Sequence, residues 1–378
     1  MNDTISLDPE RQKKAKRYAR LHRRLMLVDL FLGAFYLLVW LFLGWSVALK
    51  EFLLGFTSND WLLVAGYGLV FAAGYFILDL PLSYYSGFIL PHQYDLSTQT
   101  FTSWVIDQVK GILVGGILGG LLLEIVYAVL RAAPETWWLW AGGLLLLFNV
   151  LLSNLAPVLL FPIFYKVKPL GEEHQELVER LTALAQEAHT QVKGVFQFDM
   201  SRRTKQANAA LMGLGNTRRI VLGDTLLSEF TNEEIETVIA HELGHHVHKD
   251  IPTGILIGSL MTLAGLYLAS LGLKWGVNTF GFESPADIAA FPLFGLVTAL
   301  YGLVTMPLEN AFSRWRERNA DIYALQATGK GEAYASALVR LANQNLADVE
   351  PEGWVEFLLY SHPALGKRIK IAKEAQVK

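Results

Sequence analysis

The residues between His241 and His248 have the most distinctive chemistry in this chain. Four of its nine histidines lie there, and His241-Glu-Leu-Gly-His245 is an HExxH pattern. On a helix, positions i and i+4 lie one above the other, so both imidazoles can bind one metal ion. Glu242 lies beside them, where it can take a proton from water at the metal. The pattern predicts a metallohydrolase site, and the alternative is a set of solvated histidines on an exposed helix.

A zinc hydrolase needs a third protein ligand and an open fourth position. The long histidine motif of metzincins requires Gly at position 248 and His at 251, whereas this chain has His248 and Ile251. The chain also has no cysteine, so the third ligand is expected to be a carboxylate. Glu317 and Asp321 lie at i and i+4 of a later expected helix. We expect Glu317 to bind the metal and Asp321 to hold a ligating imidazole by its other nitrogen. The alternative is a surface helix with ordinary ion pairs.

The composition indicates a membrane protein. Hydrophobic residues make up 52% of the 378 residues, mean hydropathy is +0.32, and 18% are charged, against about 25% in typical soluble domains. The apolar residues occur in blocks, which predicts several membrane spans joined to a polar portion. A net charge of −3 provides no basic field for nucleic acid. The absence of cysteine excludes a disulfide framework, a thiol nucleophile and Cys-ligated metal.

Six apolar segments are long enough to cross a bilayer. They are residues 25–49, 61–82, 111–130, 137–164, 254–273 and 288–308. Eight basic residues precede the first span, which predicts a cytoplasmic N-terminus; they are Arg11, Lys13, Lys14, Lys16, Arg17, Arg20, Arg23 and Arg24. The segments 83–110, 165–253 and 309–378 are then expected on the same side.

The chain is expected to have four parts. Residues 1–164 hold about four spans, 165–250 form an α+β catalytic segment, 251–311 hold two further spans, and 312–378 form helices that complete the metal site. Within the catalytic segment, periodicity predicts a helix over 171–190 and short strands over 195–198, 208–212 and 219–222. Thr231-Asn-Glu-Glu234 fits a capping box and begins the HExxH helix. Helices are also expected over 312–327 and 333–345.

These residues together resemble the type 1 CAAX prenyl proteases, which are integral-membrane zinc endopeptidases with bacterial relatives. The resemblance runs from about residue 60 to the C-terminus. Beyond HExxH it rests on the segments 91–98, 162–166, 219–225 and 313–321, on Asn208, and on Ser361-His-Pro363 with Arg368. It implies a multi-pass α-helical membrane protein with a small α+β catalytic domain of the zincin type, similar to gluzincins. It also implies one Zn²⁺ per chain, bound by His241, His245 and Glu317.

The resemblance assigns three further residues. His362 and Arg368 match residues that stabilise the oxyanion near the scissile carbonyl. Asn208 matches a residue of the edge strand that binds an extended peptide. The expected partners are a peptide or membrane-protein substrate and membrane lipid, and no nucleic acid partner is expected. The absence of a long polar insertion before HExxH is typical of prokaryotic members, so we expect a plasma membrane with the catalytic domain facing the cytoplasm.

Two alternatives were weighed against a processing peptidase. One is a quality-control protease similar to the heat-shock membrane metalloproteases, which share HExxH and the later Glu. The other is a channel or catalytically inactive scaffold, since Asp29, Asp79 and Glu124 lie within apolar spans. These three residues are equally compatible with lining a hydrated chamber. The sequence leaves open six or seven spans and whether the natural substrate is prenylated.

Overall fold

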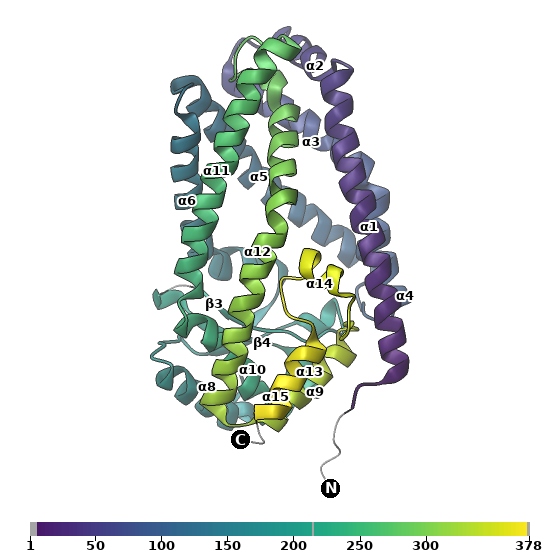
Figure 1. Ribbon diagram of the computed structural model, residues 1–378, viewed down its shortest axis with the longest axis vertical. Coiled ribbons are helices and arrows are strands. Elements are labelled where there is room, and N and C mark those ends of the chain that lie inside the picture. Colours follow the sequence, from purple (N-terminus) through teal and green to yellow (C-terminus); the bar gives the residue numbers. More distant parts are fainter. Residues whose placement is uncertain (1–5, 214, 376–378) are drawn as a thin grey trace.

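The computed structural model describes residues 6–213 and 215–375. Within these residues, six helical segments are long and apolar enough to cross a membrane, and this agrees with the expected six spans. They run along the long axis of the molecule in Figure 1. Their main helices are α1 (Pro9–Phe42), α3 (Asp60–Tyr84), α5 (Phe101–Ala132), α6 (Trp137–Leu155), α11 (Asp250–Phe280) and α12 (Phe291–Thr328).

The first predicted span has the wrong bounds. The helix α1 begins at Pro9 and ends at Phe42, and a separate helix, α2 (Trp45–Leu54), follows it. Gly44 lies between them with φ of 74°, a left-handed conformation that ends α1. The basic residues before position 25 therefore belong to the same helix as the span. The predicted span of residues 25–49 included this glycine, because hydropathy depends on how apolar a segment is and not on its backbone conformation.

Two spans contain a π-helical turn close to proline. The helix α3 continues through Tyr85–Ile89 into α4 (Leu90–Gln93), and α6 continues through Ala156–Leu160 into α7 (Phe161–Phe164). Proline lacks the N–H that a regular helix requires, so hydrogen bonding near it is rearranged. The fourth span nevertheless has the predicted bounds, Trp137–Phe164.

The sixth span and the helix expected over 312–327 are one continuous helix, α12. Apolar residues end at Leu308, but Glu, Ala and Arg in the following turns favour helix as well. Hydropathy therefore indicates where the helix leaves the apolar layer. It does not indicate where the helix ends, which is five turns further on. As a consequence, a membrane span is rigidly connected to the segment that contains Glu317.

The polar segment contains a four-stranded sheet in the order β1-β2-β4-β3. Its strands are β1 (Val167–Pro169), β2 (Val195–Phe198), β3 (Ala209–Met212) and β4 (Arg219–Gly223). The strands β2 and β4 pair in parallel with Val195 opposite Ile220, and the other two pairs are antiparallel. The strand β1 was not expected, because three residues between turn signals give little periodicity. The strand β3 forms one edge of the sheet.

Helices pack around this sheet and the C-terminal segment. They are α8 (Gln175–Glu187), α9 (Asp224–Glu229), α10 (Asn232–Val247), α13 (Gly331–Gln344), α14 (Gly353–Leu359) and α15 (Leu365–Ala375). One core joins all of these helices except α14, which packs on α12, and in it Leu181, Ile220, Leu243 and Leu338 are at 2% exposure or less. A second core, which includes Tyr67 and Trp137, joins the spanning helices at the other end.

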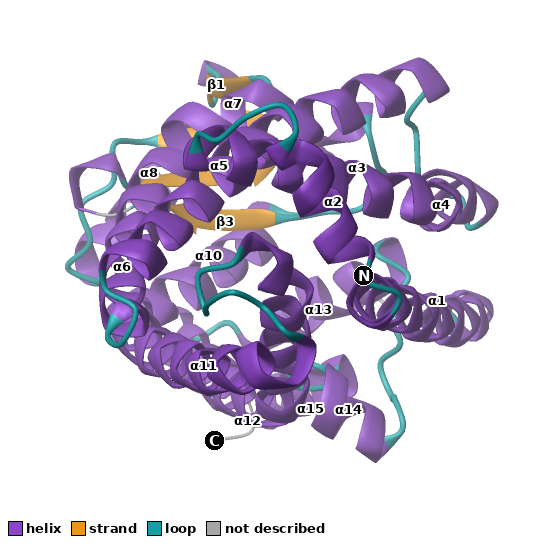
Figure 2. Cartoon of the chain, turned by 90° about the horizontal axis from the view of Figure 1, so that it is seen from above, coloured by secondary structure: helices purple, strands orange, loops and turns teal. Residues whose placement is uncertain are grey.

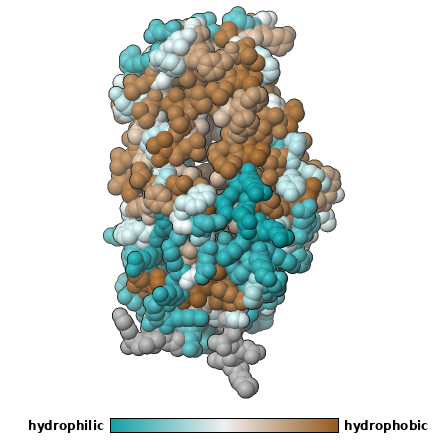
Figure 3. Space-filling view, turned by 45° about the vertical axis from the view of Figure 1, so that its right-hand side comes forward, coloured by the Kyte–Doolittle hydropathy of each residue, from teal (hydrophilic) through white to brown (hydrophobic). Residues whose placement is uncertain are grey.

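Seen along the long axis, the spanning helices form a ring, and α10, β3 and α13 are visible inside it (Figure 2). The surface changes in the same direction. Figure 3 shows hydrophobic side chains over the upper part of the molecule and mostly hydrophilic ones over the lower part. The ring of spans thus adjoins the polar catalytic segment along the long axis of the molecule, and α11 and α12 connect the two.

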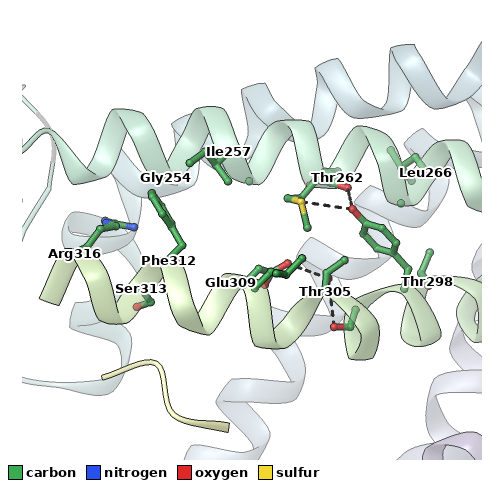
Figure 4. A pocket seen from close by; sticks show the side chains of 16 residues that line it. Gly254, Ile257, Thr262, Leu266, Thr298, Thr305, Glu309, Phe312, Ser313 and Arg316 are labelled. Atoms are coloured by element: carbon green, nitrogen blue, oxygen red, sulfur yellow. Dashed lines mark hydrogen bonds between the residues drawn. The ribbon is translucent and has the colours of Figure 1, made fainter. Parts of the chain in front are cut away.

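The helices α11 and α12 pack closely at one end and separate at the other. A Cβ at Gly272 or Gly276 would lie within 2.8 Å of α12 side chains, whereas Gly258 and Gly302 have no neighbouring atoms within 4 Å. A mostly apolar cavity of about 630 Å³ lies between the separated parts (Figure 4). Arg316 lies at its end near the polar segment. The two helices are therefore fixed far from the catalytic segment and more loosely packed beside it.

Candidate active site

The helix α10 holds two histidines toward α12. It begins with the expected capping box, in which Thr231 N donates to Glu234 Oε2 at 2.9 Å and Glu234 N donates to Thr231 Oγ1 at 3.3 Å. The opposite side of the helix is anchored in the core by residues such as Leu243. His241 and His245 lie one turn apart, with ring centroids separated by 4.9 Å. The cap and the core thus fix the orientation of both imidazoles.

The helix α12 brings Glu317 to these histidines. Its Oε2 lies 3.3 Å from His241 Nε2, and its Oε1 lies 3.3 Å from His245 Nε2. One potential ligand atom from each of the three residues lies within 4.8 Å of the other two. This close approach requires Gly244, because a Cβ there would lie 2.9 Å from the Cα of Ala320 on α12.

A carboxylate faces the other nitrogen of each histidine. Asp321 Oδ1 lies 2.9 Å from His241 Nδ1, and Asp250 Oδ2 lies 2.7 Å from His245 Nδ1. A carboxylate accepts the Nδ1 proton and leaves the Nε2 lone pair free for a metal. Sequence reasoning expected Asp321 in this role but missed Asp250. An Asp five residues after the second histidine, at the start of the next helix, was the available signal.

Asp321 lies at the centre of a buried network. Tyr334 donates its hydroxyl proton to Asp321 Oδ1 at 2.5 Å. Arg368 donates from Nε to Oδ2 at 2.9 Å and from Nη2 to Oδ1 at 2.7 Å. The third guanidinium nitrogen, Nη1, lies 3.8 Å from Glu317 Oε2. Arg368 was expected to contact an oxyanion, but two nitrogens of its guanidinium group donate hydrogen bonds to Asp321 instead. Tyr334 was not expected, because a tyrosine on an amphipathic helix gives no functional signal.

The electrostatics of the site favour a cation. Burial lowers the pKa of His241, but the carboxylates of Asp321 and Glu317 outweigh it and raise that pKa to about 9. Burial likewise lowers the pKa of His245, and Glu317 and Asp250 raise it overall. The protein thus places excess negative charge around the two imidazoles. A bound metal ion would take the place of the imidazole proton and would be stabilised by the same negative charge.

The donor set fits a zinc ion. In a tetrahedral zinc site with bonds of about 2.0–2.2 Å, neighbouring ligand atoms lie about 3.3 Å apart. Each imidazole Nε2 lies at this spacing from one oxygen of the Glu317 carboxylate, His241 from Oε2 and His245 from Oε1. In addition, Glu317 Oε2 is buried and has no hydrogen-bond donor among the described residues. Two imidazoles and one carboxylate are also the ligand types that zinc takes in hydrolases.

One cavity of about 130 Å³ brings most of the predicted site residues together. Its lining includes His241 and Glu242 from α10, Glu317 from α12 and, from other parts of the chain, Asn208, His362 and Arg368. His245 and Asp321 do not line it, but each contacts a residue that does, His245 through Glu317 and Asp321 through His241. Residues more than 150 positions apart in the sequence therefore share one small space, which is the arrangement that a hydrolytic site requires.

Three of the lining residues remain available to a substrate. Glu242 is half-buried, and within residues 6–213 and 215–375 its carboxylate makes no hydrogen bond or ion pair. His362 is 60% exposed, and its Nε2 lies 3.3 Å from Glu317 Oε1. Burial of its ring lowers the pKa of His362. Asn208 is exposed and directly precedes the edge strand β3.

This fold and site define a class of protein, the membrane metallopeptidases with an HExxH helix. Family comparison agrees with this class. Residues 172–376 match the model of peptidase family M48, and residues 4–166 match the CAAX prenyl protease N-terminal domain with five membrane helices. The chain belongs to peptidase family M48, and it is a multi-pass membrane metalloendopeptidase. In the described part of residues 4–166, four segments are long enough to span and α2 is shorter.

Individual relatives are similar to this protein along most of its chain. The "Uncharacterized metalloprotease YhfN" of Bacillus subtilis is 30% identical and aligns with 98% of this chain and 87% of its own length. The "CAAX prenyl protease 1" of Saccharomyces cerevisiae is 30% identical over 78% of this chain and 68% of its own. The crystal structure of S. mikatae Ste24p has the same fold, with a TM-score of 0.87 at 24% identity, covering 98% of this chain and 90% of that one.

Proposed function

We propose that this protein is a zinc endopeptidase that uses one Zn²⁺ per chain, bound by His241, His245 and Glu317. The observation that carries the proposal is the close approach of these three ligands, two of which line one small cavity together with the carboxylate of Glu242. A bound zinc ion would supply a Lewis acid that polarises the scissile carbonyl and acidifies water. Asp321 and Asp250 hold the two imidazoles with Nε2 toward the metal.

Glu242 is the general base in this proposal. Its carboxylate accepts a proton from the attacking water and then donates it to the nitrogen of the leaving amine. His362 donates a hydrogen bond to the oxygen that becomes negative in the transition state. Arg368 acts through Asp321, because its fork fixes the carboxylate that in turn positions His241. Arg368 is thus a positioning residue.

The edge strand β3 is the proposed binding site for the substrate backbone. An extended peptide can add to a free sheet edge through main-chain hydrogen bonds. Asn208 lies at the start of this edge and also lines the cavity beside His241. A peptide that pairs alongside β3 at Asn208 would therefore pass the proposed metal ligands.

We further propose the substrate class from the relatives named CAAX prenyl protease 1. The scissile bond then lies near the C-terminus of a membrane-anchored protein. The catalytic segment faces the cytoplasm of a prokaryotic cell, as the basic residues before the first span predict.

The test is a full-length Glu242→Gln variant, with Glu233→Gln as its control. Glu233 is exposed on the same helix and makes no contact in the cavity. Both variants should retain one zinc and the wild-type melting temperature. Peptidase kcat should fall at least about 10²-fold only in the Glu242 variant, because loss of a general base has that effect. Near-wild-type turnover of the Glu242 variant would contradict the mechanism.

The substrate class needs a separate comparison. A C-terminal CAAX peptide is assayed with and without a prenyl group, beside a peptide with the same residues in shuffled order. Faster cleavage of either CAAX form than of the shuffled peptide supports the proposed class. Equal cleavage of all three contradicts it and favours a general quality-control protease.

A further inference from the structure

The first half of α1 is a basic helix that extends from the spanning part of the molecule. Large exposed apolar side chains begin at Leu27, which is 61% exposed. Before it lie the eight Lys and Arg residues from Arg11 to Arg24. The helix is unbroken from Pro9, so these charges are rigidly connected to the first span. A hydrophilic surface adjoins the hydrophobic one on the side of the molecule seen in Figure 3.

One face of this basic helix packs on the C-terminal segment of residues 312–378 and on the loop that follows α4. Ala15 is completely buried there. Arg11 Nε donates to the carbonyl of Asn343 at 2.7 Å, and Gln12 Nε2 donates to the carbonyl of Ala347 at 3.2 Å. The Tyr18 ring lies 4.9 Å from that of Tyr94. These contacts fix the rotation of the helix about its own axis.

The opposite face carries a row of cations, which we term the basic stripe; it consists of Lys13, Lys16, Arg17, Arg20 and Arg24. At 100° per residue, these five positions fall within an arc of about 100°. All five side chains are exposed. Among the described residues, Lys13 pairs with Glu10 at 2.7 Å, and the other four form no ion pair or hydrogen bond.

The basic stripe begins at the edge of the apolar layer. With a rise of about 1.5 Å per residue, Arg24 lies about 4.5 Å below Leu27 and Arg20 about 10 Å below it. The headgroup layer on each side of a bilayer is about 5–8 Å thick. Arg17 and Lys16 lie within about one Debye length of that layer. The stripe thus extends from inside the headgroup layer into the water beside it.

We propose that the basic stripe binds the headgroups of anionic phospholipids. A guanidinium matches a phosphate in a bidentate geometry, and clusters of four to eight cations beside a span attract anionic lipid. The rule that predicts orientation requires positive charge near a span but not its placement on one face. Here the packed face leaves the stripe free, and bound lipid would hold the catalytic segment against the bilayer surface.

The test uses the detergent-solubilised full-length protein. It is equilibrated with equal amounts of phosphatidylglycerol and phosphatidylcholine, and retained lipids are counted by native mass spectrometry. The wild type should prefer phosphatidylglycerol. In the variant Arg17→Gln, Arg20→Gln, Arg24→Gln this preference should fall at least about tenfold, since each cation near an anionic surface contributes about fivefold. The variant Arg17→Lys, Arg20→Lys, Arg24→Lys should keep most of it.

The control variant is Lys193→Gln, Lys370→Gln, Lys373→Gln, which removes three exposed charges from the catalytic segment. It should keep the wild-type preference. If the triple glutamine variant of the stripe does not fold, the single variants Arg20→Gln and Arg24→Gln carry the same test. An unchanged preference in folded stripe variants would overturn the proposal. So would a wild type that retains both lipids equally, which would leave an acidic polypeptide as the partner of the stripe.

Discussion

At the scale of single residues, the site is a chain of paired charges that ends at the proposed metal ligands His241 and His245. Arg368 is bonded to Asp321, and Asp321 is bonded to His241. Asp250 Oδ2 likewise lies beside His245 Nδ1, and Arg316 Nε lies 3.3 Å from the same carboxylate oxygen. Each histidine is therefore backed by a carboxylate, and each carboxylate by an arginine. Such outer contacts set the orientation and basicity of the ligands.

Asp250→Ala should weaken zinc binding. Its carboxylate is 3% exposed and is the acceptor for His245 Nδ1. Losing such a partner typically lowers metal affinity by about 10–100-fold. Competition with a fluorescent zinc chelator measures this change on purified protein. Asp348→Ala is the matched control, because Asp348 is also buried but its carboxylate accepts from Glu350 N rather than from a histidine. Equal affinity of the two variants would remove Asp250 from the site.

His362→Ala should lower kcat by roughly 10² while leaving zinc content unchanged. KM should change little, because the charge that His362 would contact exists only in the transition state. The side chain is 60% exposed, so its loss should also leave the melting temperature unchanged. If instead the melting temperature falls and kcat of the folded fraction does not, His362 has only a structural role in its turn.

At the scale of elements, the crossing of α10 and α12 assembles the site. The histidines come from one helix and Glu317 from the other. The two helices approach closely at Gly244, where a Cβ would meet the backbone of Ala320. Backbone atoms cannot move aside as the end of a flexible side chain can. The separation of the proposed metal ligands thus depends on a glycine, which has no side chain that could bind a metal.

Gly244→Ala should therefore separate the two helices. We expect a loss of about 1–3 kcal/mol in the free energy of unfolding, the usual cost of overpacking. Zinc affinity should fall together with it, since Glu317 moves away from both imidazoles. Gly258→Ala is the control, because a methyl group there meets no atom within 4 Å. Thermal unfolding and zinc titration on both variants measure the difference, and identical results would contradict the close-packing argument.

At the scale of the whole molecule, the start of α1 and the C-terminal helix α15 both lie at the polar end in Figure 1. Six spans return the chain to the side on which it began, and the basic residues of α1 predict that this side is the cytoplasm. The short connection between α2 and α3 lies at the opposite end.

The absence of native cysteine makes this topology directly testable. A cysteine in place of Ser58, which is exposed between α2 and α3, should react with a membrane-impermeant maleimide in intact cells or spheroplasts. A cysteine in place of Lys373 should react only after the membrane is permeabilised. The reverse pattern of labelling would place the catalytic segment outside.

The sequence alone determined the features that depend on local spacing and composition. Hydropathy gave six spans, the capping box gave the start of α10, and the i, i+4 spacing placed His241 and His245 on one face. These features depend on residues within a few turns of one another, where helix geometry relates sequence distance to position in space. The pairing of Asp321 with a ligating imidazole was likewise expected, once Glu317 was chosen.

The tertiary structure decided what depends on residues distant in the sequence. Arg368 forms hydrogen bonds with Asp321 rather than remaining free for an oxyanion. Asp250 and Tyr334 also belong to the site, although neither was predicted from the sequence. The continuity of α12 and the close contact at Gly244 also emerged only from the fold. Spacing fixes direction only within one helix. The distance between atoms on different helices is set by how those helices pack, and one segment's pattern contains no record of that packing.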